Sequence, residues 1–171
     1  DFGALQCTPA NPSCNDCPLR DECLSLAAGT VAERPVKAGR TRIRPRYLNY
    51  LHLECGGRIA LRRRPEGDIW QGLYDLPAIE SDRPLDFTEL AAAPPFRDMF
   101  GTLPYRLVRT IRMPKHQLSH QTLHAAYHRL ALDAWPSAAE GWTLVPYEQL
   151  EDYAIPRLLD RYFERIGNSD T

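Results

Sequence analysis

Four cysteines within the first 23 residues constrain the fold of this chain more than any other feature. They are Cys7, Cys14, Cys17 and Cys23, separated by six, two and five residues. The close middle pair would supply two ligands from one turn, and the flanking proline-containing loops would bring in the other two. Tetrahedral zinc and a [4Fe–4S] cube both accept four thiolates. The number of thiolates does not decide between these two centres.

A disulfide framework explains these cysteines less well. The chain has five cysteines, an odd number, and no segment resembling a secretory signal. Clustered thiols without a secretory context indicate a reducing cytoplasm. The fifth cysteine, Cys55, lies at a predicted turn, and we interpret it as a single structural residue.

The exact cysteine spacing, with Pro18 after the third cysteine, resembles the cluster loop of the endonuclease III and MutY family of DNA glycosylases. In that family the loop closes the catalytic domain and carries a [4Fe–4S] cluster, so the resemblance implies that these four cysteines bind one. Residues 1–5 resemble the end of the last catalytic-domain helix. We therefore expect residues 1–28 to be the end of a catalytic domain, with a small helical iron–sulfur cluster loop.

Length and composition fit part of a larger globular protein. The chain has 171 residues, begins with Asp1 rather than Met, and is long enough for one main domain plus an appendage. No apolar run approaches membrane-spanning length, so we expect no membrane partner. The net charge is −1, but basic residues gather between positions 34 and 64 and between 97 and 115. This segregation suits a polyanionic partner; the alternative is a solvated basic linker.

The chain after the cysteines reads as a short helix followed by a linker. Residues 18–28 are predicted to be helical, with Gly29 as the stop. Residues 29–46 are polar, basic and interrupted by proline and glycine, which is typical of an interdomain linker. We expect four arginines of this segment to lie along a DNA phosphate backbone: Arg40, Arg42, Arg44 and Arg46.

Residues 47–168 alternate between strand and helix patterns, which predicts an α/β (α+β) domain. Strands 47–54 and 58–63 should form a hairpin around Gly56-Gly57. Further strands are predicted at 107–113, 123–132 and 142–145, and a short helix at 86–93. A final helix is indicated by apolar residues at helical spacing from Ile155 to Ile166, with Pro156 at its start and Gly167 just past its end.

Three segments of this domain resemble the C-terminal domain of MutY. Residues 70–77, Trp-Gln-Gly-Leu-Tyr-Asp-Leu-Pro, look like its W-x-G-L-[WY]-x-[FL]-P segment. Residues 116–120 resemble its H-x-[FL]-[ST]-H loop, and residues 153–156 the start of its last helix. The resemblance implies a Nudix-like fold, a mixed sheet between helices, acting as an 8-oxoguanine-recognition domain.

The resemblance also implies a function and its residues. MutY is an adenine DNA glycosylase of base excision repair that removes adenine mispaired with 8-oxoguanine, and its catalytic groups precede the cluster. This chain would therefore carry no catalytic residue. It would bind DNA and read the oxidised base through Leu118, Ser119 and His120. The hydroxyl of Ser119 can accept a hydrogen bond from the N7–H that distinguishes 8-oxoguanine from guanine.

The expected partners are double-stranded DNA with an 8-oxoguanine:adenine mismatch and the N-terminal catalytic domain of the same protein. We expect a monomer in the bacterial cytoplasm, associated with the nucleoid. Four histidines recur every four residues from His116 to His128. A helix would align them as a metal site, but the resemblance makes this stretch a loop and a strand, so His124 and His128 are expected to be ordinary strand residues.

Two other functions remain as alternatives. An active Nudix hydrolase of oxidised nucleotides needs a helix rich in carboxylates to hold Mg²⁺. After Pro77 the chain offers only scattered acids, with neither an Arg-Glu nor a Glu-Glu pair: Glu80, Asp82, Asp86 and Glu89. A zinc-stapled nucleic-acid-binding module is the second alternative.

Overall fold

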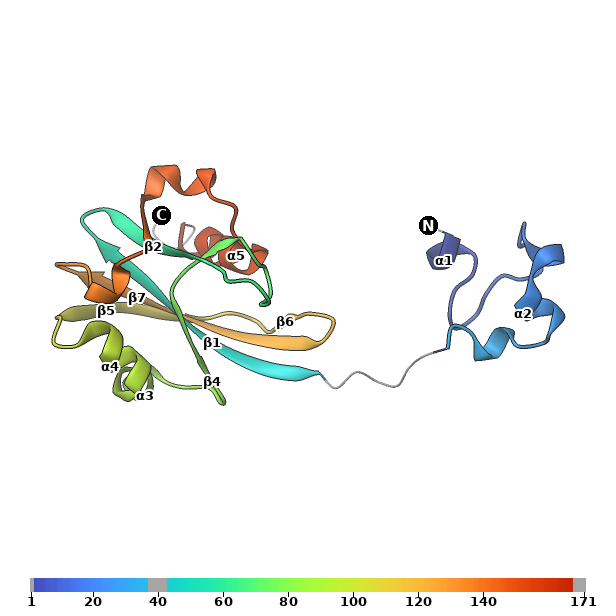
Figure 1. Ribbon diagram of the computed structural model, residues 1–171, viewed down its shortest axis with the longest axis horizontal. Coiled ribbons are helices and arrows are strands. Elements are labelled where there is room, and N and C mark those ends of the chain that lie inside the picture. The colour runs from blue at the N-terminus through green and yellow to red at the C-terminus, as the bar shows by residue number, and fades with distance from the viewer. Residues whose placement is uncertain (1, 37–42, 168–171) are drawn as a thin grey trace. The chain divides into compact units, whose positions relative to one another are not determined.

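The computed structural model describes residues 2–36 and 43–167 and divides into two compact units, Asp1–Arg42 and Ile43–Thr171 (Figure 1). Within residues 2–36, the first unit contains two short helices and two 3-10 turns: α1 (Phe2–Leu5), Arg20–Glu22, α2 (Leu24–Ala27) and Val31–Glu33. The helix predicted over 18–28 is therefore broken. The break falls at Cys23, whose extended backbone (φ −80°, ψ 103°) precedes α2 instead of lying within it.

The predicted linker differs from the structure at both ends. At its start, Thr30 N–H donates to the carbonyl of Ser25 at 2.9 Å, and the turn Val31–Glu33 follows directly, so this part belongs to the first unit. At its end, Arg44 and Arg46 lie in strand β1 (Arg44–Cys55). The second domain therefore begins before residue 47. Arg40 and Arg42 lie outside the described residues.

The second unit is built around a mixed sheet with the strand order β3-β2-β1-β7-β5, to which β4, β6 and β8 are added by pairing with β1, β7 and β2. After β1, its strands are β2 (Arg58–Arg63), β3 (Tyr74–Asp75), β4 (Ala78–Ser81), β5 (Tyr105–Arg112), β6 (His116–Gln117), β7 (Gln121–Leu132) and β8 (Thr143–Pro146). Its helices are α3 (Phe87–Ala92), α4 (Pro94–Phe100) and α5 (Arg157–Gly167), and 3-10 turns span Ser137–Ala139 and Tyr147–Asp152.

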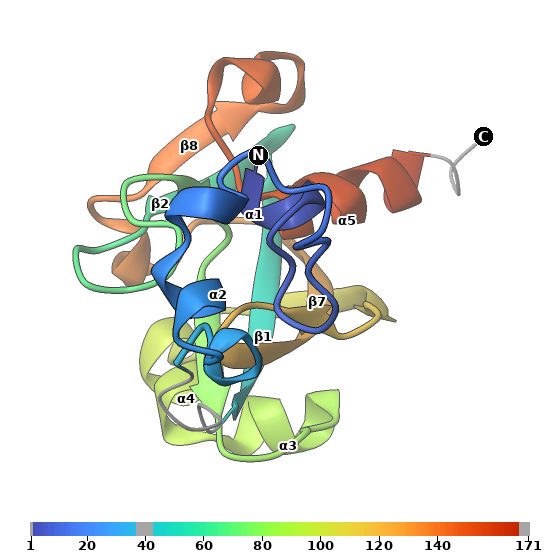
Figure 2. The same ribbon diagram turned by 90° about the vertical axis from the view of Figure 1, so that its right-hand side faces the viewer.

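The parallel pair β1–β7 forms the centre of the sheet. It runs in continuous register from Arg44 opposite Gln121 to Glu54 opposite Ala131. The other strand pairs are antiparallel, including the predicted hairpin in which Glu54 faces Ile59. Figures 1 and 2 show the start of β1 and the β6–β7 turn at the same end of the sheet.

Helices cover both faces of this sheet, which confirms the predicted mixed sheet between helices (Figures 1 and 2). Alternate residues of β1 point to opposite faces. Leu48 and Tyr50 join the core cluster that contains the buried face of α5. Leu51 and Leu53 join a second cluster that contains residues of α3 and α4. In the described residues, no helix has both the length and the apolar character needed to cross a membrane.

Local sequence signals explain most element boundaries. Gly56 and Gly57 have φ of +56° and +74°, the left-handed conformation that a tight two-residue hairpin turn requires. Asp86 and Glu89 form a capping box at the start of α3. Helix α4 was not predicted, although its pattern is readable. It begins with a proline pair at its first two positions, and its buried residues Phe96 and Phe100 are four positions apart.

His124 and His128 are strand residues of β7, as predicted. His128 is fully buried beside α3, with Nδ1 3.0 Å from the Thr110 hydroxyl. On the opposite face His52 is also fully buried, with Nδ1 2.7 Å from the Tyr162 hydroxyl and Nε2 2.6 Å from that of Tyr147. Burial lowers the pKa of His52 to about 3 and that of His128 to about 4, from an ordinary value of 6.5.

We predict that acid destabilises this domain. Below pH 6.5 the unfolded chain binds a proton at His52 and at His128, whereas the folded chain does not, so stability is lost as the pH falls. Asp75 acts in the opposite sense, because burial raises its pKa to about 6 and favours its protonated form in the fold. The net loss in the free energy of unfolding between pH 7 and pH 5 should be about 2 kcal/mol, measured by urea denaturation.

Replacing His52→Gln should reduce this pH dependence, although it also lowers the overall stability. His120→Gln is the matched control, because this histidine is exposed in the folded chain. Equal stability of the wild-type chain at pH 5 and pH 7 would contradict the assignment of neutral buried histidines.

Candidate nucleic-acid interface and cysteine cavity

The four N-terminal cysteines line a single cavity of about 400 Å³. The middle pair lies on one turn, in which Cys17 N–H donates to the carbonyl of Cys14 at 3.3 Å. Cys7 follows α1, and Cys23 lies at the N-cap of α2. All four are free thiols. The structure therefore brings together the cysteines that the spacing had grouped.

The donors of this cavity suit a thiolate-bound metal centre. Four thiols line one shared space of about 400 Å³, and both zinc and iron–sulfur clusters take thiolate ligands. In residues 2–36 and 43–167, no three His, Cys, Asp or Glu side chains lie close enough to hold a single metal ion. Arg20 and Arg34 line the same cavity and add positive charge beside it.

The predicted reading residues lie on the turn between β6 and β7. Leu118 N–H donates to the carbonyl of Gln121 at 2.8 Å and closes this turn. Ser119 and His120 are exposed on it. Leu118 is half-buried and packs against the α5-side core, so its side chain supports the turn from inside. Two of the three predicted residues are thus free to meet a ligand.

Arg44 lies next to this turn. Its backbone N–H donates to the carbonyl of His120 at 3.1 Å, and it pairs with Gln121 in the β1–β7 register. Its side chain is exposed, as phosphate contact requires. The structure therefore joins Arg44, Ser119 and His120, from two separate sequence segments, on one edge of the domain.

Arg46 does not have the exposed linker position that was predicted for it. Its side chain is 13% exposed and makes a two-pronged ion pair with Glu80, at 2.8 Å and 2.6 Å. It also donates to Asp68 at 2.7 Å. These hydrogen bonds raise the pKa of Arg46, and the one from Arg46 is the main reason that the pKa of Asp68 is lowered to about 2. Arg46 is an internal cross-link, because its donors are already committed to two carboxylates and to the side-chain amide of Gln121.

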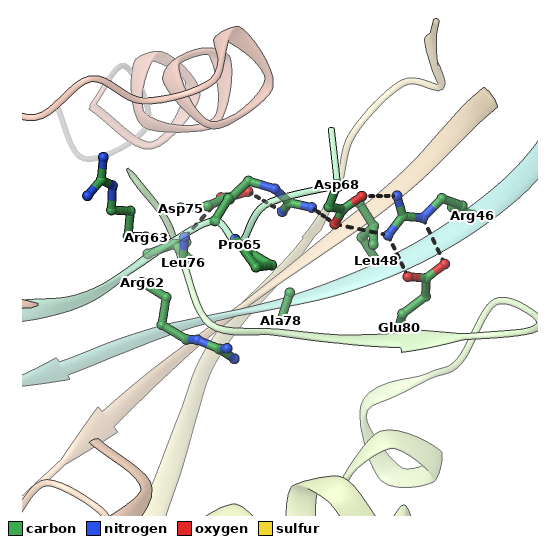
Figure 3. A pocket seen from close by; sticks show the side chains of 11 residues that line it. Arg46, Leu48, Arg62, Arg63, Pro65, Asp68, Asp75, Leu76, Ala78 and Glu80 are labelled. Atoms are coloured by element: carbon green, nitrogen blue, oxygen red, sulfur yellow. Dashed lines mark hydrogen bonds and ion pairs between the residues drawn. The ribbon is translucent and has the colours of Figure 1, made fainter. Parts of the chain in front are cut away.

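These ion pairs continue along a shallow cavity of about 190 Å³ (Figure 3). Arg64 bridges Asp68 and Asp75, contacting Asp75 at 3.0 Å. Figure 3 shows this chain of pairs running from Glu80 to Asp75, among residues that line the cavity. The two partly buried guanidinium groups face three carboxylates, so this cluster has no excess positive charge with which to attract a phosphate.

Three of the four carboxylates noted after Pro77, namely Glu80, Asp86 and Glu89, are likewise occupied. Glu80 is paired with Arg46. Asp86 accepts from the backbone N–H of Glu89 at 2.8 Å, and Glu89 accepts from that of Asp86 at 2.9 Å and pairs with Arg83. Helix α3 uses these acids to cap itself and offers no row of carboxylates for a divalent cation.

The sequence comparisons cover most of the second unit. The family described as NUDIX domain matches residues 49–165, more than half of the chain. The chain belongs to the NUDIX domain family.

Two curated proteins with similar sequences are adenine DNA glycosylases. The adenine DNA glycosylase of Buchnera aphidicola subsp. Baizongia pistaciae is 28% identical over 126 residues, which cover 72% of this chain and 33% of that protein. The adenine DNA glycosylase of Arabidopsis thaliana is 28% identical over 93 residues, which cover 46% of this chain and 15% of that protein. The chain thus spans a third or less of the length of these relatives.

Solved structures agree on the fold. The C-terminal domain of mouse MUTYH, determined in complex with human PCNA, has a TM-score of 0.53 at 20% identity and covers 73% of this chain and 89% of its own. The MutT protein of Methanosarcina mazei Go1 has a TM-score of 0.56 at 17% identity, with 75% and 97% covered. These matches show a Nudix-like fold for the second unit, and the sequence relatives that it resembles are adenine DNA glycosylases.

The structure adds site residues that the sequence analysis missed. Gln121 and Asp68 join the Arg46 cluster, and Trp70 contacts His116 next to the turn. Trp70 is the first residue of the recognised 70–77 segment, and Asp68 lies two residues before it. The sequence therefore offered a local signal for these two residues. Their partners come from strands distant in sequence, so the contacts themselves required the fold.

We predict that the chain does not hydrolyse 8-oxo-dGTP in the presence of Mg²⁺. The acids required to hold the cation are committed to Arg46 and to the cap of α3. Release of pyrophosphate or phosphate should stay at background in a coupled assay in which a MutT-type hydrolase serves as the positive control. Turnover that disappears in a Glu80→Gln variant would show that this reading of the carboxylates is wrong.

Proposed function

We propose that this chain is the C-terminal part of a MutY-type adenine DNA glycosylase that removes adenine mispaired with 8-oxoguanine. The observation that carries the proposal is the exposed Ser119–His120 turn beside Arg44, on a Nudix-like domain whose carboxylates are occupied. Such a domain is suited to reading a base and unsuited to hydrolysing a nucleotide.

The cysteine cavity supports the first part of this proposal. We assign Cys7, Cys14, Cys17 and Cys23 as ligands of a [4Fe–4S] cluster. The size of the cavity and its four thiols suit a cube better than a single zinc ion. When bound, the cluster would cross-link the loop by four covalent iron–sulfur bonds. The short helices α1 and α2 supply little packing of their own, so this loop would gain most of its order from the cluster.

We predict that the full-length protein, purified anaerobically, is brown and contains about four irons per chain. Cys14→Ala should lose most of the iron, because it removes one ligand of the close pair. Cys55→Ala is the matched control and should keep it, since Cys55 ends β1 in the other unit. Stoichiometric zinc without iron would replace this assignment with the zinc-stapled alternative.

The reading turn is chemically suited to 8-oxoguanine. Guanine has a hydrogen-bond acceptor at N7, whereas 8-oxoguanine has an N7–H donor there. A hydroxyl group can accept from that N–H. The side chain of Ser119 is exposed, and within the described part of the chain no hydrogen bond occupies it. Arg44 and His120 lie beside it and would hold neighbouring phosphates without reading sequence.

Catalysis would reside in the remainder of the full-length protein. Glycosylase chemistry requires a general acid, a carboxylate to stabilise the sugar cation and a pocket for the flipped base. We place these groups in the N-terminal catalytic domain, which precedes the cysteines in the resembling family. The present chain would then supply recognition of the oxidised base on double-stranded DNA.

We predict that replacing both Ser119 and His120 with Ala in the full-length enzyme weakens its preference for 8-oxoguanine:adenine over guanine:adenine. One neutral hydroxyl contact lies at the low end of the range for a base contact, so the preference should fall about fivefold. Binding and single-turnover excision on both duplexes measure it. Ser137→Ala, another exposed serine of this domain, is the matched control. If both substrates lose activity equally, the turn does not read the lesion.

A further inference from the structure

The turn that carries Ser119 and His120 does not hold its own position through these two side chains. Within the described residues, neither side chain has a hydrogen-bond partner. The turn, residues 116–121, is closed by the 2.8 Å hydrogen bond from Leu118 N–H to the Gln121 carbonyl and by the amide of Gln117, which donates to the Leu118 carbonyl at 2.9 Å. Its placement relative to the sheet comes from the packing of Leu118 on the core, from the hydrogen bond of Arg44 N–H to the His120 carbonyl, and from side-chain contacts at its two ends.

The β7 end of the turn is held by Arg46. The guanidinium donates from Nη1 to Oε1 of Gln121 at 3.2 Å, while the same group is fixed by Glu80 and Asp68. Because the two carboxylates hold the guanidinium in a fixed orientation, its remaining hydrogen bond, from Nη1, is directed at the side chain of Gln121. Gln121 is the first residue of β7 and follows His120 directly.

The β6 end of the turn is held by Trp70. Its ring lies 6.0 Å from that of His116, between ring centroids, and the guanidinium of Arg64 lies 5.7 Å from the same tryptophan ring. Trp70 has φ of +58°, a conformation that bulky residues rarely adopt and that the surrounding contacts must maintain. Asp68, two residues earlier, binds both Arg46 and Arg64. One loop thus fixes both ends of the turn.

We infer that Arg46 and Gln121 are positioning residues for reading 8-oxoguanine, because they set the place of the Ser119 hydroxyl without touching the base. This inference rests on the proposed function. It also gives the ion-pair chain of Figure 3 a role beyond stability: it couples β4 and the Trp70 loop to the edge of the domain that meets DNA.

The test uses the full-length enzyme and two variants that disturb the link in different ways. Arg46→Lys keeps the charge but loses the planar fork that engages Glu80 and Gln121 together. Gln121→Ala keeps the ion pairs of Arg46 with Glu80 and Asp68 and removes only the hydrogen bond from Arg46 to the Gln121 side chain. Each should reduce the preference for 8-oxoguanine:adenine over guanine:adenine by about two- to fivefold, no more than the loss expected when the Ser119 and His120 side chains themselves are removed. The double variant should lose little more than either single one, because both break the same link.

Arg129→Lys is the matched control, since Arg129 pairs with Glu54 at 3.0 Å near the opposite end of the β1–β7 pair. It should lower the melting temperature without changing the preference. Amide hydrogen exchange gives a second readout that is independent of DNA: exchange at Leu118 N–H should accelerate in Arg46→Lys and Gln121→Ala but not in Arg129→Lys.

Three outcomes separate the two proposals. If Ser119→Ala reduces the preference and both link variants reduce it too, with faster exchange in the turn, the inference stands. If Ser119→Ala reduces it while the link variants keep the wild-type preference, the positioning role is refuted and the proposed function survives. If Ser119→Ala leaves the preference unchanged, the proposed function fails, and the inference fails with it.

Discussion

The parallel pairing of β1 with β7 is the constraint on which the rest of the second unit depends. Its register stacks Tyr50 on Tyr127 at 4.7 Å and gives α5 a flat aromatic surface to cover, with Tyr162 stacked on Tyr127 at 4.0 Å. The same register sets Arg44 opposite Gln121. A shift of one residue would turn the apolar side chains of both strands to the wrong faces and would separate the arginine from the reading turn.

Charge in this domain serves two different purposes that the sequence does not distinguish. Arg44 and Arg46 are two positions apart on one strand, yet the first is exposed and the second is enclosed by carboxylates. An exposed arginine can replace the water bound to its guanidinium with a phosphate group. A partly buried arginine stays bound to its carboxylate partners, because they offset the free-energy cost of removing it from water. The basic character of a segment is therefore a poor guide to which of its residues meet DNA.

The sequence predicted the parts of the structure that are determined by residues close together in the chain. The Gly56-Gly57 turn, the short helix at 86–93, the apolar face of α5 and the cysteine spacing all produced elements or groupings that the structure contains. The errors arose where distant partners decide the outcome. The β1 strand begins at Arg44 because β7 pairs with it from Gln121 onward, and no local feature of residues 44–46 indicates this.

The Arg46 cluster and the contact of Trp70 with His116 were also beyond sequence reasoning, because each joins segments from different parts of the chain. From their spacing, the carboxylates after Pro77 were interpreted as an incomplete Nudix set. That Glu80 is occupied by an arginine, and Asp86 and Glu89 by a helix cap, became visible only in three dimensions.

The central strand pair has a consequence for the order of folding during synthesis. β1 is made early in this domain, but its parallel partner is complete only at Leu132, and α5 follows later still. Contacts between such distant segments form slowly, because the entropy of closing a long loop is lost before the contacts can stabilise the fold. On the ribosome, β1 and its apolar residues therefore remain unpaired until β7 has emerged, when most of the domain has been synthesised. The cysteine loop precedes β1 and depends on no later strand within its own unit, so it can assemble first.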